Sequence, residues 1–211
     1  MAYLGTQPND VKKNIGLYTP SEILQLTKDG SWGGSLELIE EQTFSGVSSV
    51  EFTDIKENVY DVHFIQVSNF QHNGANNSGI RWLLSNNGGT SYITSGYQMA
   101  FFDIDTGGGT TDNKSTSRAH FQATNISLDR DTNPTSRSAG YYYLYNAGNS
   151  SKYTFQTNQT YSVDTSYNIA FGGAVYTTAE TINAFKFDDF GAGYNLYGTI
   201  KLYGVKQIWV T

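Results

Sequence analysis

The chain lacks cysteine, and this absence excludes several kinds of functional site. Its 211 residues contain no Cys, so a disulfide scaffold, an iron–sulfur cluster, a thiolate zinc site and a cysteine nucleophile are all ruled out. Charged residues are also scarce, at 15% against about 25% in an average soluble domain. The formal net charge of -6 argues against nucleic-acid binding, because a basic surface supplies most of that affinity.

Long hydrophobic runs are missing as well. The longest nearly uncharged apolar stretch lies around residues 99–104, whereas a transmembrane helix needs about 20 apolar residues. The first ten residues have neither a basic segment nor a long apolar run, so we expect no secretory signal. We therefore predict a protein that is made in a cytoplasm, does not insert into membranes, and stays there or leaves by a route that needs no signal. Aromatic residues make up 15% of the chain, which indicates an ordered protein.

The beginning of the chain differs in pattern from the remainder. Residues 1–34 hold two of the three prolines and the best helix signal, Thr19-Pro20-Ser21-Glu22. Thr19 suits the N-cap, and Pro20 suits the first helical position. Because such a short helix is marginal alone, we predict that residues 1–34 form an N-terminal docking arm. The alternative is that this segment covers the open end of the domain formed by residues 35–211.

Residues 35–211 alternate between apolar and polar side chains over short stretches, and this period of two predicts β-strands. We expect strands at 35–43, 50–52, 60–64, 80–84, 92–102, 117–127, 140–146, 152–162, 167–172, 182–187 and 197–210. Turn-rich segments such as 106–113 separate them, and Asn86-Asn87-Gly88-Gly89 predicts a hairpin turn between two neighbouring strands. Strands at this spacing without a long helix indicate an all-β fold, an antiparallel β-sandwich of jelly-roll-like form.

Residues that could support catalysis are scattered. His63, His72 and His120 are far apart in sequence, and for each we expect a surface residue, with a general base as the alternative. In the 60–64 strand, Tyr60, Val62 and Phe64 alternate with His63, which places this histidine on the polar face.

Acidic loops are the only candidate metal sites. The Asp and Asn residues around 103–113, 129–133 and 188–189 could ligate calcium, although such residues are also common in turns. A carboxylate pair for glycoside hydrolysis could be drawn from the same acids, but nothing in the sequence brings two of them together. The glycine-rich segment 106–110 lacks the lysine and the following helix of a phosphate loop. We predict no catalytic residue, no metal, no cofactor and no enzymatic activity.

Tyr141-Tyr142-Tyr143-Leu144-Tyr145 is the most informative aromatic segment. Tyr141, Tyr143 and Tyr145 share one face of a strand, and Tyr142 and Leu144 share the other. We expect one face to enter the core. The other face then suits a subunit interface or a carbohydrate contact, because tyrosine combines a large rigid area with a polar tip. A strand buried on both faces remains the alternative.

Three groups of residues carry a family resemblance. The first is residues 1–8 together with 16–26 and Trp32; the second is 44–55, the strand at 60–67 and 81–89; the third is 185–187 with 198–206. In this order they resemble virion proteins of tailed bacteriophages, notably marine and cyanobacterial ones. The resemblance covers most of the chain, although each piece alone is only a strand with a turn.

The resemblance implies a non-enzymatic virion structural protein with a β-sandwich body, of the tail fibre, appendage or adaptor type. It implies a place on the virion exterior, contact with other virion proteins, a homo-oligomer with a trimer favoured, and a host-surface glycan as a further partner in host recognition. A capsid decoration protein and a free-standing carbohydrate-binding module remain alternatives. The interface residues that we predict are Tyr3, Leu4, Leu17, Tyr18, Ile23, Leu24, Leu26, Trp32, Tyr141, Tyr143 and Tyr145.

Overall fold

The protein is seen here as a computed structural model that describes residues 19–21, 24–25, 35–73, 80–122, 137–163, 167–189 and 193–206. The chain divides into two compact units, Met1–Ser35 and Leu36–Thr211. In the first unit, Pro20, Ser21, Leu24 and Gln25 are helical, where the sequence predicts a short helix. Within the described residues, no helix is long and apolar enough to cross a membrane.

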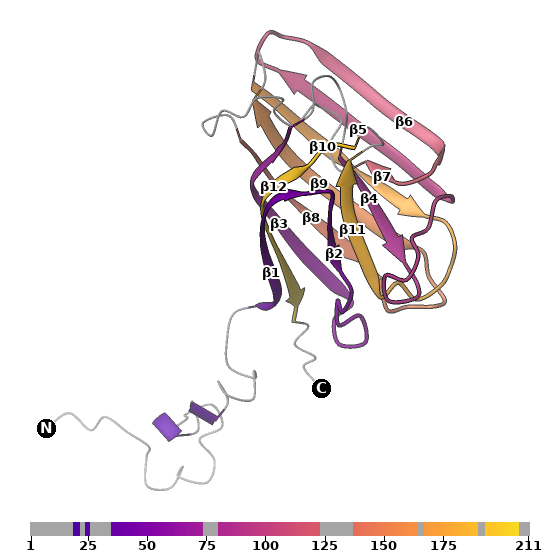
Figure 1. Ribbon diagram of the computed structural model, residues 1–211. Coiled ribbons are helices and arrows are strands. Elements are labelled where there is room, and N and C mark those ends of the chain that lie inside the picture. The colour runs from indigo at the N-terminus through magenta and orange to yellow at the C-terminus, as the bar shows by residue number, and fades with distance from the viewer. Residues whose placement is uncertain are drawn as a thin grey trace, which may run out of the picture. The chain divides into compact units, whose positions relative to one another are not determined.

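The second unit is an antiparallel β-sandwich of two unequal sheets (Figure 1), which confirms the all-β prediction. The larger sheet has the order β1 (Leu36–Val47), β12 (Leu196–Val205), β3 (Val62–His72), β8 (Ser138–Tyr145), β9 (Thr154–Val163), β10 (Tyr167–Tyr176), β5 (Tyr97–Asp105) and β6 (Thr110–Arg118). The smaller sheet has the order β2 (Ser49–Phe52), β11 (Ala184–Asp189), β4 (Ile80–Ser85) and β7 (Phe121–Gln122).

The chain passes repeatedly between the two sheets. From β1 to β5 each strand lies in the sheet opposite to its predecessor, whereas β8, β9 and β10 form a meander within the larger sheet. The first and last strands, β1 and β12, pair with each other. This winding closes both sheets around one core.

An aromatic core holds the sheets together. Trp82 on β4 is fully buried, and its ring centroid lies 5.3–5.7 Å from those of Phe121, Tyr142, Phe185 and Phe187. Because Tyr142 belongs to the larger sheet and the other three rings to the smaller one, this cluster links the two layers. Such ring pairs stabilise a core beyond the area that they bury.

The prediction of which face of the 60–64 strand points into the core is wrong. In β3, His63 and Ile65 point into the core and are fully buried, whereas Val62 and Phe64 are only partly buried on the outer face. The short predicted window sets Tyr60, Val62 and Phe64 against Asp61 and His63, so its alternation favours the row that includes Val62 and Phe64, which the structure turns outward. Only the continuation of the strand to Val67, also buried, makes the inward row clear.

The predicted hairpin around Asn86–Gly89 is also wrong. The turn exists, because Gly88 and Gly89 have φ values of 68° and 83°, a conformation that glycine adopts easily. However, β4 before it belongs to the smaller sheet and β5 after it to the larger one. The Asn–Gly signal specifies a local reversal, while packing selects the strand partner.

Strand β6 begins earlier than expected. The predicted turn at 106–113 is confined to Thr106–Gly109, where the Asp105 carboxylate accepts hydrogen bonds from the Gly107 and Gly109 amides at 2.6 and 3.1 Å. β6 is polar along its whole length because it is an edge strand with mostly exposed side chains. Such a strand shows no alternation that could reveal it in the sequence.

Candidate functional site

The outer face of the larger sheet carries the predicted tyrosines. On β8, Tyr142 and Leu144 are buried in the core, at 2% and 0% exposure, whereas Tyr141, Tyr143 and Tyr145 lie half-buried on the opposite face. The structure therefore confirms that one face of this segment enters the core. The interface role of the outward tyrosines stays a prediction.

Five rings on this face form what we call the tyrosine cluster: Phe64 on β3, Tyr141, Tyr143 and Tyr145 on β8, and Tyr203 on β12. The Phe64 ring lies 5.1 Å from Tyr143, 5.9 Å from Tyr203 and 6.1 Å from Tyr141, measured between centroids. Mutual packing of this kind restricts the rings and leaves little side-chain entropy to lose on binding. The cluster is therefore a preorganised aromatic surface.

The other half of the same face has rings that are more exposed. Phe102 on β5 and Phe171 on β10 face each other across the strand pair, with ring centroids 5.8 Å apart. Their exposed fractions are 37% and 44%, and those of Phe155 on β9 and Tyr167 on β10 are 44% and 41%. Phe102 and Phe171 thus form an exposed aromatic pair, whereas Phe155 lies farther along the same strands, opposite Val175.

A groove of about 700 Å³ crosses this half, and we call it the outer groove. It spans four adjacent strands in the order β9, β10, β5 and β6. Its lining residues are Gln98, Met99, Ala100, Lys114, Ser115, Thr116, Phe155, Gln156, Thr157, Gly173, Ala174 and Val175. Ala100 and Gly173 oppose each other across β5 and β10, so the two smallest outward side chains form its floor.

The sequence did not reveal the outer groove because it did not show which face of β9 points into the core. The inward residues of this strand are polar and nearly fully buried, and they are Thr154, Gln156, Asn158, Thr160 and Ser162. Within the described parts of the chain, the side-chain amides of Gln156 and Asn158 have no hydrogen-bond partner. The alternation of Phe155 and Tyr161 with these residues was the available signal, but hydrophobicity alone would turn the aromatic residues inward.

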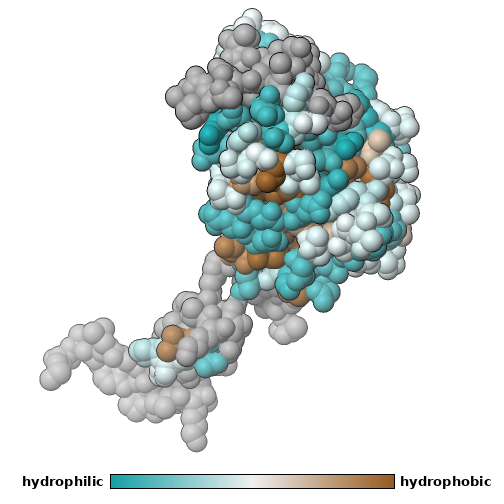
Figure 2. All heavy atoms as spheres, in the orientation of Figure 1, coloured by the Kyte–Doolittle hydropathy of each residue, from teal (hydrophilic) through white to brown (hydrophobic). Residues whose placement is uncertain are grey.

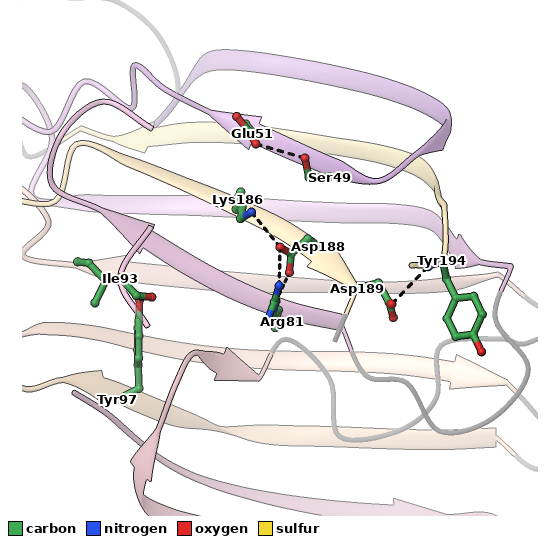
Figure 3. A network of polar contacts seen from close by, with 9 residues as sticks. All are labelled: Ser49, Glu51, Arg81, Ile93, Tyr97, Lys186, Asp188, Asp189 and Tyr194. Carbon is green, nitrogen blue, oxygen red and sulfur yellow. Dashed lines mark hydrogen bonds and ion pairs between the residues drawn. The ribbon is translucent and has the colours of Figure 1, made fainter. Parts of the chain in front are cut away.

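The smaller sheet carries an ion network on its outer face. Figure 2 shows hydrophilic side chains interrupted by hydrophobic patches on the side seen in Figure 1, and Figure 3 shows the ion pairs that the smaller sheet contributes. Both Arg81 Nε and Arg81 Nη2 donate to the Asp188 carboxylate, the latter at 3.1 Å, and Lys186 Nζ lies 3.0 Å from the same group. The hydrogen bond to Asp188 raises the pKa of the Arg81 guanidinium.

Two of the carboxylates that could ligate calcium already have other partners in the structure. Asp188 is held by two cationic side chains, and Asp105 accepts backbone amide hydrogen bonds in its turn. Among the described residues, no group of three or more His, Asp or Glu side chains is placed to hold a metal ion. The segment 129–133 lies outside the described residues.

The three histidines are buried, so the prediction of surface residues is wrong. Their exposed fractions are 0% for His63 and His72 and 3% for His120. His63 Nε2 donates to the carbonyl oxygen of Ile55 at 2.8 Å, and the His72 ring stacks on Tyr194 at 5.9 Å. Burial lowers the pKa of His63 and of His120 to about 4, so both are neutral core side chains at neutral pH.

Most of the predicted docking-arm residues fall on undescribed parts of the chain. Leu24 is described and is 55% exposed. Tyr3, Leu4, Leu17, Tyr18, Ile23, Leu26 and Trp32 lie outside the described residues. The docking role of this segment therefore stays a prediction.

Comparison with known proteins adds no assignment. No protein-family model matches the chain, and no significant match was found among curated proteins or solved structures. A functional proposal therefore depends on the surface chemistry of the sandwich and on the sequence resemblance.

Proposed function

We propose that the protein is a non-enzymatic structural component of a bacteriophage virion, displayed on the exterior as part of a tail fibre or appendage. The sequence resemblance suggests the class of particle. The observation that carries the proposal is the tyrosine cluster, a preorganised aromatic surface on the face of the larger sheet that the smaller sheet does not cover. In this proposal the cluster binds another copy of the chain, giving a homo-oligomer with a trimer favoured.

The surroundings of the tyrosine cluster favour a contact of this kind. Next to it, Lys201 on β12 pairs with Glu41 on β1 at 3.1 Å, and Lys206 pairs with Glu37 at the same distance. The charges beside the cluster are thus compensated within one chain. Association through aromatic area rather than through charge depends little on ionic strength, because salt screens exposed ion pairs. This property suits a particle that meets variable salt outside its host.

The proposed oligomer is tested by sedimentation velocity on Tyr143→Ala. Tyr143 packs against both Phe64 and Tyr145, so its removal opens the middle of the cluster. We expect self-association to weaken at least tenfold, the effect of losing about 1.4 kcal/mol of contact energy. Tyr167→Ala is the matched control, because Tyr167 is exposed on the same sheet but lies outside the cluster. A monomeric wild-type protein, or an unchanged Tyr143→Ala oligomer, would refute the role of the cluster.

The place on the particle is tested by a virion map with copy counting. A few to a few tens of copies agree with a tail appendage, whereas hundreds indicate a capsid decoration protein, and absence from the particle refutes the proposal. Deletion of residues 1–34 tests the docking arm. We expect the truncated protein to remain folded and to fail to join particles, and normal incorporation would refute the arm.

A further inference from the structure

We infer that the outer groove is a binding site for a neutral oligosaccharide. This inference goes beyond the proposed virion role, and it depends on the groove residues rather than on the tyrosine cluster. The groove lies on β9, β10, β5 and β6, and the cluster lies on β12, β3 and β8. The two adjoin where Phe155 of the groove pairs with Tyr145 of the cluster across β9 and β8, whereas Ala100 and Gly173 lie on strands that carry no residue of the cluster.

The size and shape of the outer groove fit a short, extended ligand. Its volume of about 700 Å³ lies within the roughly 300–1,000 Å³ of typical ligand sites. Four neighbouring strands are about 14 Å across, because adjacent strands lie about 4.8 Å apart. Ala100 and Gly173 keep the floor low, which lets a flat ring approach the sheet surface. The groove thus accommodates several linked sugar rings better than one compact molecule.

The groove combines an aromatic wall with uncharged polar groups. Phe155 lines one side with 44% of its surface exposed, and Val175 opposes it across the strand pair of β9 and β10. Gln98, Thr116 and Thr157 line the same groove. A pyranose ring has an apolar face of C–H groups and a rim of hydroxyls, so it can stack on the phenyl ring while its hydroxyls bond the amide and threonine groups.

The electrostatics of the groove favour a neutral ligand. Lys114 is the one charged residue among the described residues that line it. Its Nζ atom lies 2.6 Å from the Asp112 carboxylate on the same strand, so the local charge is compensated. An anionic polysaccharide would find no unpaired cation there, whereas a neutral one would lose no charge contacts on binding.

A peptide that binds by adding a strand does not fit the groove. β9, β10 and β5 each have a hydrogen-bonded strand on both sides. Their backbone groups are therefore already paired. Of the four strands that line the groove, β6 is at the end of the sheet, and a peptide added to that edge would lie beside the groove in the plane of the sheet. A ligand that uses side-chain stacking and hydroxyl groups is the better match.

The test is isothermal titration of the full chain with maltohexaose, cellohexaose, xylohexaose and laminarihexaose, with dextran sulfate as a charged probe. We expect at least one neutral hexasaccharide to bind. Phe155→Ala should weaken that binding at least tenfold, and Ala100→Trp, which fills the floor from an exposed position, should abolish it. Tyr167→Ala is the control, because Tyr167 is 41% exposed on the same sheet but lies about 20 Å along β10 from Gly173. The affinity of this variant for the sugar should stay within twofold of the wild-type value.

Several results would overturn the inference. These are absence of binding by all four neutral sugars, binding that survives both groove variants, and tighter binding of dextran sulfate than of any neutral sugar. Loss of self-association in Ala100→Trp would instead identify the groove as a protein interface. Circular dichroism and thermal unfolding show whether each variant is folded. Because Ala100→Trp leaves the tyrosine cluster intact, its incorporation into virions separates failure of the sugar site from failure of the virion proposal.

Discussion

Burial of His63 makes the stability of the sandwich depend on pH in a way that one substitution can isolate. The ring is fully buried, and Nε2 donates to the Ile55 carbonyl oxygen at 2.8 Å. Within the described residues, Nδ1 has no hydrogen-bond partner, so a proton added there would be a buried, unsatisfied donor. Desolvation lowers the pKa to about 4, outweighing the opposite effects of the Ile55 hydrogen bond and of Asp61.

The size and sign of the effect follow from linkage. In the unfolded chain the His63 pKa is near 6.5, and in the folded chain it is about 4. Because the folded state binds this proton less readily, the stabilisation is complete above pH 6.5 and is lost as the pH falls towards 4. At pH 5 the loss amounts to about 2 kcal/mol for this one group. That is a large part of a typical domain stability of about 5–15 kcal/mol.

The assay compares urea unfolding of the wild type and of His63→Gln at pH 7.5 and pH 5.0. Both proteins share the titration of their other groups, so the difference between their two pH-dependent losses isolates His63. We expect the wild type to lose about 2 kcal/mol more than the variant between these pH values. Direct titration of the His63 ring by NMR should give a midpoint near 4. Equal losses in both proteins, or a midpoint above about 6, would refute the reasoning.

Two further substitutions test the core and the ion network, both by urea unfolding. Trp82→Ala removes the fully buried ring that links the sheets and should lower the free energy of unfolding by about 3–5 kcal/mol; a loss below about 1 kcal/mol would contradict this central role. Asp188→Asn leaves Arg81 and Lys186 without their shared carboxylate and should lower the free energy of unfolding by about 1–3 kcal/mol. Leu38→Ala, at an exposed site, is the control and should change it by no more than about 0.5 kcal/mol.

The sequence alone determined that this is an all-β sandwich. A period of two in short segments, frequent Gly and Asn turns and the absence of a long helix are local properties, and they predicted most of the strands within a few residues. The split of Tyr142 and Leu144 from the outward tyrosines was predictable for the same reason, since neighbouring side chains of a strand must point to opposite faces. Edge strand β6 escaped because its exposed polar side chains do not alternate.

Only the tertiary structure decided which face of each strand points inward and which strands are neighbours. His63 is buried and Phe64 is not, and β9 turns its polar row inward and Phe155 outward, which creates one wall of the outer groove. The turn at Gly88 and Gly89 leads into the other sheet rather than into a hairpin. The physical reason is that a period of two defines the two faces of a strand but does not say which of them is buried. Contacts with strands that are distant in sequence decide this.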